Sequence, residues 1–333
     1  LDQPGGILTI RKASYLLLHP VRKMVRELAE KLHFTGIYFH ELFHDDMEIY
    51  VKERDRRPHY SFYRMDQLFD FIAECGLIPF VELSFVPFLM VENVNKDALM
   101  RNSISDMPTD MQQWDRLVYH VVEHMVERYG RSQVLKWKFC VWNSPDNPRI
   151  NYSALQRENY YRLYLSTWKV IKAIDERFQV GTSALMSVNL LYPEWMDSFA
   201  SFYQKQHCEP DFVMMNLYTV DDTPQSIQRR QPAGIMQQRD AVYNVIRRIL
   251  NNNEDCGWKV RTWYVAEWNF DLGWNNALQD TMFYPAYIVK SMVDCWQTGI
   301  AFGVMDPLEN LSEDQMIPVS YTHLRAHETD SYL

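Results

Sequence analysis

The stretch Lys138-Phe-Cys-Val-Trp-Asn-Ser-Pro-Asp146 decides the fold that this sequence predicts. Apolar residues run into Trp142, Asn143, Ser144 and a proline, where the chain must turn. A second stretch, 262–269, has the same design, an apolar strand that carries Glu267 near its end. Strands that end in polar residues beside a turn are typical of the active-site face of α/β barrels. The two stretches therefore predict one shared site at the ends of two strands.

Apolar stretches and segments of helical periodicity alternate along the chain, which predicts a parallel (β/α)8 TIM barrel of the α/β class. A doubly wound sheet is the alternative, but no Gly-rich phosphate loop follows the first strand. Strands are expected at 7–14, 34–40, 77–85, 138–142, 179–185, 211–218, 261–267 and 300–305, and helices at 20–32, 65–75, 109–129, 154–176, 193–205, 233–251 and 281–297.

Composition narrows the class of protein. The chain has 333 residues, of which 47% are hydrophobic, enough for one large core. Its net charge of -9 argues against a nucleic-acid partner within this fragment. No apolar run approaches the roughly 20 residues that a membrane span needs, so no membrane partner is expected. The 5 cysteines are odd in number and widely spaced, which predicts reduced thiols in a cytoplasmic protein.

The two ends of the chain predict a fragment. No convincing apolar stripe follows the eighth strand, so we expect a barrel truncated after that strand. The stretch Pro318-Val-Ser-Tyr-Thr-His-Leu-Arg-Ala-His-Glu-Thr329 resembles the translated sequencing adapter that terminates some assembled metagenomic reads. We therefore expect a barrel domain over 1–317 and a non-native tail over 318–333. Because the chain starts at Leu1 without methionine, its natural start is expected to lie further upstream.

Several motifs resemble glycoside hydrolase family 39, the family of β-xylosidases and α-L-iduronidases. The resemblance covers about residues 5 to 315. It implies a retaining enzyme on a (β/α)8 barrel, with the acid/base residue at the end of strand four and the nucleophile at the end of strand seven. The motifs are His-Asp-Asp-Met at 44–47, Phe-Val-Glu-Leu-Ser-Phe-Val-Pro at 80–87, Arg-Tyr-Gly at 128–130, Val-Trp-Asn-x-Pro-Asp at 141–146 and Ala-Glu-Trp-Asn at 266–269.

The catalytic pair that the resemblance implies is incomplete. Glu267 stands at the nucleophile position, and Ser144 stands where the family's Trp-Asn-Glu-Pro motif has the acid/base glutamate. A serine hydroxyl cannot protonate a leaving group near neutral pH, and loss of the acid typically costs about 10²–10⁴-fold in rate. Taken without the resemblance, Glu267 would be read as a strand-end carboxylate in a structural ion pair.

The resemblance also implies a set of sugar-binding residues. Strand six usually carries a His-x-Tyr pair and here has Asn216 and Tyr218, whereas Phe302 stands where strand eight usually has a tryptophan. Asn143 matches the residue that contacts the sugar 2-hydroxyl. The full set of expected substrate-binding residues is His40, Trp142, Asn143, Asn216, Tyr218, Trp268 and Phe302.

Three functional hypotheses follow. The first is a domain that binds a xylose-like sugar or xylo-oligosaccharide with little or no hydrolysis, such as the sensing domain of an arabinose-regulator-type transcription factor. The second is an active retaining β-xylosidase in which Glu41, Glu82 or Asp146 supplies the acid. The third is a truncated, non-functional fragment that exposes apolar barrel surface and aggregates. No cofactor is expected under any of them.

One motif suggests a metal. His120-Val-Val-Glu-His124 has the spacing of a zinc-binding helix. On a helical wheel, His120 and Glu123 point away from the apolar stripe that centres near Val118 and Met125, and His124 lies at its margin. Ligands that face solvent do not converge on an ion, so we predict no metal site here.

Overall fold

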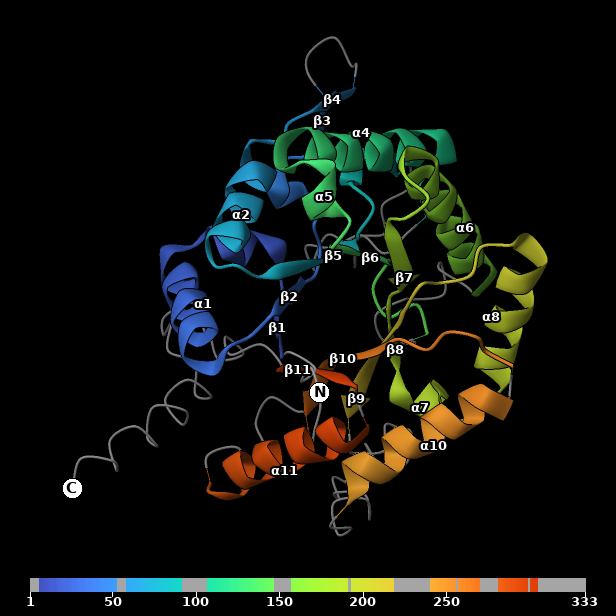
Figure 1. The fold of residues 1–333 in the computed structure, drawn as a ribbon. Helices are drawn as coiled ribbons and strands as arrows, with labels where there is room; N and C mark the ends of the chain where they lie inside the picture. The colour runs from blue at the N-terminus through green and yellow to red at the C-terminus, as the bar shows by residue number, and fades with distance from the viewer. Residues whose placement is uncertain are drawn as a thin grey trace.

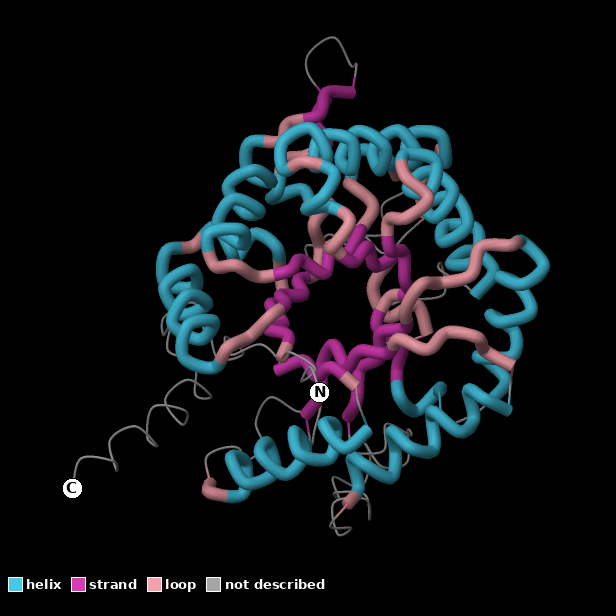
Figure 2. Tube along the Cα trace, viewed as in Figure 1, coloured by secondary structure: helices cyan, strands magenta, loops and turns pink. Residues whose placement is uncertain are grey.

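The computed structural model describes residues 6–52, 58–91, 107–146, 157–190, 193–218, 240–255, 257–269, 281–298 and 300–304. Within these residues, parallel strands lie around a central axis, and helices form an outer ring (Figures 1 and 2). The predicted α/β barrel architecture is therefore confirmed. The expected truncation after strand eight and the expected tail over 318–333 lie outside the described residues.

The strands pair in parallel in the order β7-β6-β5-β2-β1-β11-β10-β9-β8. The first and last strands of this order are joined in the chain through Ser183 alone, so together they fill the fifth predicted strand position. The amide of Asp211, just before β9, also donates to the Val180 carbonyl of β7 at 2.9 Å. The strands are β1 Ile7–Ile10, β2 Gly36–Phe39, β5 Ile78–Leu83, β6 Lys138–Val141, β7 Gln179–Thr182, β8 Ala184–Met186, β9 Val213–Tyr218, β10 Trp263–Asn269 and β11 Ala301–Val304.

The outer helices follow from the apolar periodicity that the sequence shows. In α4, the cap residue Asp110 accepts a hydrogen bond from the amide of Gln112 at 2.8 Å, and Gly130, with φ of 81°, ends the helix. The helices are α1 His19–Leu32, α2 Tyr63–Glu74, α4 Met111–Tyr129, α5 Arg131–Val134, α6 Arg157–Ile174, α7 Ser187–Leu190, α8 Pro193–Gln206, α10 Ala241–Asp255 and α11 Phe283–Thr298.

Some predicted elements differ from those observed. The first strand ends at Ile10 rather than at residue 14, because the chain turns into a 3-10 helix over Ala13–Leu17. A hairpin of β3 (Tyr50–Lys52) and β4 (Pro58–Tyr60) was not predicted, since strands of 3 residues are too short to show alternation.

The core has two layers. An inner cluster fills the barrel axis and includes Tyr38, Phe80, Cys140, Phe212 and Met214. The remaining apolar side chains pack between the sheet and the helices. Because side chains alternate along a strand, the inner positions that follow Tyr38 and Phe80 toward the carboxyl ends are occupied by His40 and Glu82, respectively. The strand pattern thus places a polar layer directly above an apolar plug.

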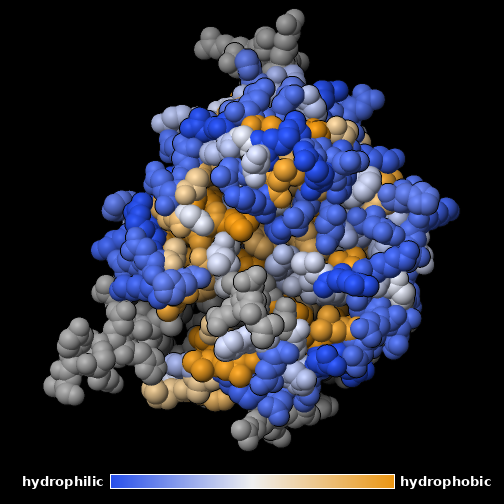
Figure 3. All heavy atoms as spheres, in the orientation of Figure 1, coloured by the Kyte–Doolittle hydropathy of each residue, from blue (hydrophilic) through white to orange (hydrophobic). Residues whose placement is uncertain are grey.

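Hydrophobic side chains also reach the surface along α11, where Val289, Met292, Val293 and Trp296 are exposed (lower part of Figure 3). In the part of the chain that the structure describes, no helix is both long enough and apolar enough to cross a bilayer.

Candidate active site

The site is centred on His40, which lies between two carboxylates at the carboxyl ends of the strands. Its Nδ1 atom lies 2.7 Å from Oε2 of Glu82, and its Nε2 atom lies 2.6 Å from Oε1 of Glu267. His40 directly follows β2, whereas β5 supplies Glu82 and β10 supplies Glu267. A histidine held between two carboxylates at both ring nitrogens is fixed in position and in charge.

Glu82 is the buried member of this group, with its side chain 0% exposed. The hydroxyls of Tyr38 and Ser84 donate to its two oxygens, and the amide of Glu41 donates to Oε1 at 3.3 Å. Asn143, which follows β6, donates from Nδ2 to both oxygens at 3.1 and 3.2 Å. A buried carboxylate is tolerated when donors of this kind surround it. Glu82 is therefore a satisfied anion inside the fold and is not aimed at solvent.

The charge on His40 follows from its neighbours. Burial alone would lower the pKa of this imidazole, but the carboxylates of Glu82 and Glu267 outweigh it and raise the pKa well above its ordinary range. His40 is consequently a cation at neutral pH. Tyr38 is uncharged, since burial and the nearby Glu82 raise its pKa and keep the phenol neutral.

Glu267 reaches this site because of a β-bulge. The β9–β10 register shifts between Val265 and Glu267, which leaves Ala266 as an extra residue. Val265 faces the helices and Ala266 faces the barrel axis. Strict alternation would return Glu267 to the helix side, but the extra residue moves it to the axis side, where it meets His40.

Ser144 lies beside the same group. Its hydroxyl donates to the Ala184 carbonyl at 3.1 Å and accepts from Nδ2 of Asn216 at 3.3 Å. Asn216 is paired in register with Glu267, so this side chain connects the position of Ser144 to that of the carboxylate. Ser144 and Glu267 are thus linked through Asn216 at the same end of the barrel.

The turn after β6 is unusual in its backbone. Trp142 has φ of 72° and Ser144 has φ of 35°, although neither is glycine. Left-handed conformations of such residues cost of order 1–3 kcal/mol each and are concentrated at functional sites. The turn after β6 thus has two left-handed residues within three positions.

Two of the predicted sugar contacts are buried tryptophans. Trp142 is 0% exposed and its ring packs against Phe85 and Trp114, with centroids 5.2 and 6.5 Å away. Trp268 is 3% exposed and packs against Tyr287 of α11, with centroids 5.3 Å apart. The bulge explains Trp268, because it turns this side chain toward the helices when it turns Glu267 inward. Both tryptophans support the site from the core.

The other predicted sugar-binding residues lie in or directly after the strands of the barrel. Asn143 and Asn216 are buried beside His40 and Ser144, respectively. Tyr218 is the last residue of β9, and Phe302 pairs with Val265 between β10 and β11. The side chains of Tyr218 and Phe302 lie outside the described residues.

The three proposed substitute acids have different environments. Glu82 is fully buried, as described above, and Oδ2 of Asp146 accepts from the amide of Met186 at 2.9 Å. Glu41 follows His40 and lies 3.8 Å from Lys12. Burial raises the pKa of the Glu41 carboxyl in spite of the nearby His44 and Lys12, which is the direction of shift that a general acid needs.

The zinc-like motif is explained by packing. His124 lies 2.7 Å from Oδ1 of Asp66 and stacks on Phe62, and His120 lies against Tyr60. Both histidines are half-buried between α4 and neighbouring segments, which corrects the expectation that this face is open to solvent. Among the described residues, no group of three or more His, Cys, Asp or Glu side chains has the arrangement of a metal site.

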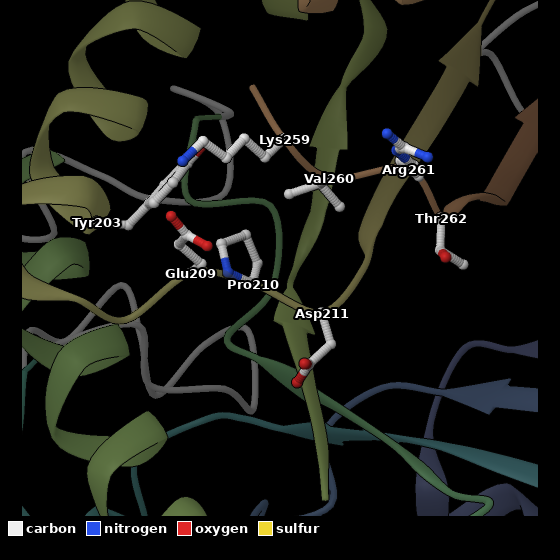
Figure 4. Close-up of a pocket in the computed structure, with 8 residues that line it drawn as sticks. All are labelled: Tyr203, Glu209, Pro210, Asp211, Lys259, Val260, Arg261 and Thr262. Atoms are coloured by element: carbon white, nitrogen blue, oxygen red, sulfur yellow. The ribbon is translucent and has the colours of Figure 1, made fainter. Parts of the chain in front are cut away.

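A separate hollow lies at the other end of the strands (Figure 4). Asp211 just before β9 and Arg261 just before β10 are among the residues that line it, together with Tyr203 of α8. In α/β barrels this amino-terminal end contributes to stability, whereas chemistry occurs at the carboxyl ends. The hollow is therefore distinct from the site around His40.

A parallel barrel with carboxylates gathered at its strand ends is the architecture of a barrel glycosidase. The chain belongs to the family described as Glycosyl hydrolases family 39, whose model matches residues 12–323. It is similar to a β-xylosidase of Caldicellulosiruptor saccharolyticus, with 26% identity over 273 residues that cover 82% of this chain and 54% of the relative. A β-xylosidase of Geobacillus stearothermophilus is 27% identical over 274 residues, with 78% and 52% covered.

The structure is also similar to that of a monomeric β-xylosidase from Caulobacter crescentus, with a TM-score of 0.76 and 24% identity. That match covers 90% of this chain and 59% of the other. At this level of identity the likeness establishes the fold. The chain spans about half the length of the curated relatives that it matches.

Proposed function

We propose that this family 39 barrel binds a xylose-type sugar at the carboxyl ends of its strands, with little or no hydrolysis of ordinary glycosides. Glu267 attacks the anomeric carbon only when the leaving group departs without a proton. This proposal rests on the contact between His40 and Glu267. Ser144 lies close to that contact, because Asn216, the register partner of Glu267, donates to the Ser144 hydroxyl. The β-xylosidase relatives support the choice of sugar.

The chemical reasoning follows from the two roles that a retaining mechanism needs. A nucleophilic carboxylate forms a glycosyl–enzyme bond, and a second carboxylic acid, about 5 Å away, protonates the leaving oxygen. In our proposal Ser144 takes the acid side of this pair. It is 2% exposed, and its hydroxyl is bonded to the Ala184 carbonyl. A hydroxyl in that place can bind a sugar oxygen, but its pKa is too high for proton donation.

The test compares turnover of an aryl β-xyloside by the wild type, by Ser144→Glu and by Ser144→Glu combined with Glu267→Gln. Binding of xylose and xylobiose is measured by calorimetry on the same preparations. We expect sugar binding in all three, a gain of activity in Ser144→Glu, and its loss in the double variant. Absence of both binding and turnover in every variant would overturn the proposal.

Binding without turnover also suits a sensing role, in which the barrel would report a sugar to a transcription regulator. This narrower proposal predicts that the natural gene encodes a helix-turn-helix segment on the same chain. Sequencing the natural gene upstream of the codon for Leu1 tests it, and a secretion signal there would contradict it.

An active β-xylosidase is the second candidate, because burial raises the pKa of Glu41 toward the range of a general acid. In that case wild-type protein would hydrolyse xylobiose, and Glu41→Gln would abolish this hydrolysis while sparing aryl xylosides with good leaving groups. If Glu41→Gln kept wild-type activity on both substrates, Glu41 would be ruled out as the acid.

A further inference from the structure

We propose that Glu82 is a positioning residue for the nucleophile: it anchors His40 through Nδ1, so that the N–H at Nε2 is presented to Glu267. Glu82 contacts no solvent and acts on the reaction only through His40. This inference rests on the proposed role of Glu267 and extends it to a residue from another strand.

Geometry supports the proposal first. Donors from different parts of the sheet converge on Glu82, namely the hydroxyl of Tyr38 on β2, the hydroxyl of Ser84 after β5 and the amide of Asn143 after β6. Each hydrogen bond removes a rotational freedom of the carboxylate. The ring of His40 is therefore also held in position, because its Nδ1 lies 2.7 Å from the fixed oxygen Oε2 of Glu82.

Charge supports it second. A fully buried carboxylate needs a nearby cation, and His40 is the cation that contacts it. The same imidazolium donates to Oε1 of Glu267, which is 14% exposed, so it restricts the rotation of that carboxylate. Without Glu82, Nδ1 of His40 would keep the neutral side-chain amide of Asn143, 2.7 Å away, but would lose its anionic partner, so the ring would be held less firmly. The orientation of the nucleophile would then no longer be fixed.

Titratable groups face His40 from several of the elements around it. Glu82 faces it from β5, Glu267 from β10, Tyr38 from its own strand and Glu41 from the following turn. Of these, Glu82 and Glu267 make the direct contacts with the ring nitrogens. Removing the Glu82 charge should therefore lower the titration midpoint of His40 more than neutralising Glu41.

The experiment uses the full chain and the variant Glu82→Gln. A 2-deoxy-2-fluoroxyloside with a dinitrophenolate leaving group labels the nucleophile. A carboxylate oxygen of Glu267 bonds to C1 while the C1–O bond breaks, and dinitrophenolate leaves with the electron pair, so no proton is needed. Mass spectrometry locates the label, and NMR follows the titration and tautomer of His40.

We expect Glu82→Gln to label Glu267 roughly 10²-fold more slowly than wild type, as a misplaced group would. The effect should fall on the rate constant of labelling at saturation rather than on the affinity for the fluoroxyloside. The His40 titration midpoint should fall in the same variant. Asp175→Asn is the matched control, because Asp175 is also buried and ion-paired but lies before β7 at the other end of the barrel.

The outcomes separate the two proposals. If wild type is not labelled at Glu267, the proposed nucleophile fails, and the NMR titration still tests whether Glu82 holds His40. If wild type is labelled and Glu82→Gln reacts at the same rate with an unchanged His40 titration, the positioning role is refuted. Should Glu82→Gln not fold, Tyr38→Phe removes one donor to the same oxygen and keeps the charge, and it should slow labelling to a smaller extent. Wild-type behaviour of that variant would then refute the role.

Discussion

His40, which directly follows β2, and Glu267 of β10 are in direct contact, with Nε2 and Oε1 2.6 Å apart, although β1 and β11 lie between β2 and β10 in the sheet. The contact therefore crosses the mouth of the barrel and depends on the curvature of the sheet. It joins two residues that the resemblance had assigned separately, one to sugar binding and one to catalysis.

The first prediction concerns this contact. Replacing His40 by Ala should lower turnover of an activated aryl β-xyloside by roughly 10²-fold, because the Glu267 carboxylate loses the group that orients it. Steady-state kinetics should show the loss in kcat, with a smaller change in KM. A matched control is Lys12→Met, which removes a cation from the rim near Glu41 but not from Glu267. Equal losses in both variants would contradict a specific role for His40.

A second prediction follows from the proposal that Ser144 occupies the acid/base position. On that proposal, water has no general base to help it attack the glycosyl–enzyme, so this intermediate should accumulate. Azide attacks without a base, and it should accelerate turnover of an aryl xyloside several-fold in wild type. Mass spectrometry should detect the β-xylosyl azide. Ser144→Glu is the control, since a restored base should make the azide effect small. An azide-independent wild type that lacks a burst of released phenol would refute the prediction.

The third prediction is a dependence of stability on pH. In an unfolded chain His40 titrates near pH 6.5, and folding raises its pKa. The stabilisation is therefore complete below about pH 6.5 and is lost as the pH rises from there through the folded pKa. Urea unfolding from pH 6 to 9 should show wild type losing stability faster than His40→Asn. The range ends below the ordinary Tyr titration near 10, so Tyr38 does not contribute. Parallel curves for the two proteins would contradict this prediction.

The fourth prediction separates core tryptophans from sugar contacts. Trp268→Ala should destabilise the fold by about 3–5 kcal/mol, because it removes a buried ring that packs on Tyr287. Trp268→Phe keeps most of this packing and should retain xylose affinity within about 2-fold in calorimetry at a temperature where it is folded. A larger loss of affinity in Trp268→Phe, with stability preserved, would return Trp268 to the sugar-binding set.

Much of the fold could be predicted because its signals are local. The apolar stripe of α4 and the apolar run of β6 each follow from a few neighbouring residues. The pairing of β3 with β4 and the split of the fifth strand at Ser183 were not predicted, since both depend on backbone pairing rather than on a pattern of side chains.

By itself, the sequence determined the alternation of strands and helices, and with it the placement of Ser144 and Glu267 at strand ends on the same face of the barrel. Only the tertiary structure decided which way these side chains face. Period-two alternation puts Glu267 on the helix side and Trp268 on the axis side, and the bulge at Ala266 reverses both. The anchoring of His40 by Glu82 likewise depends on the pairing of β2 with β5, because contacts between two strands leave no periodic trace in the sequence.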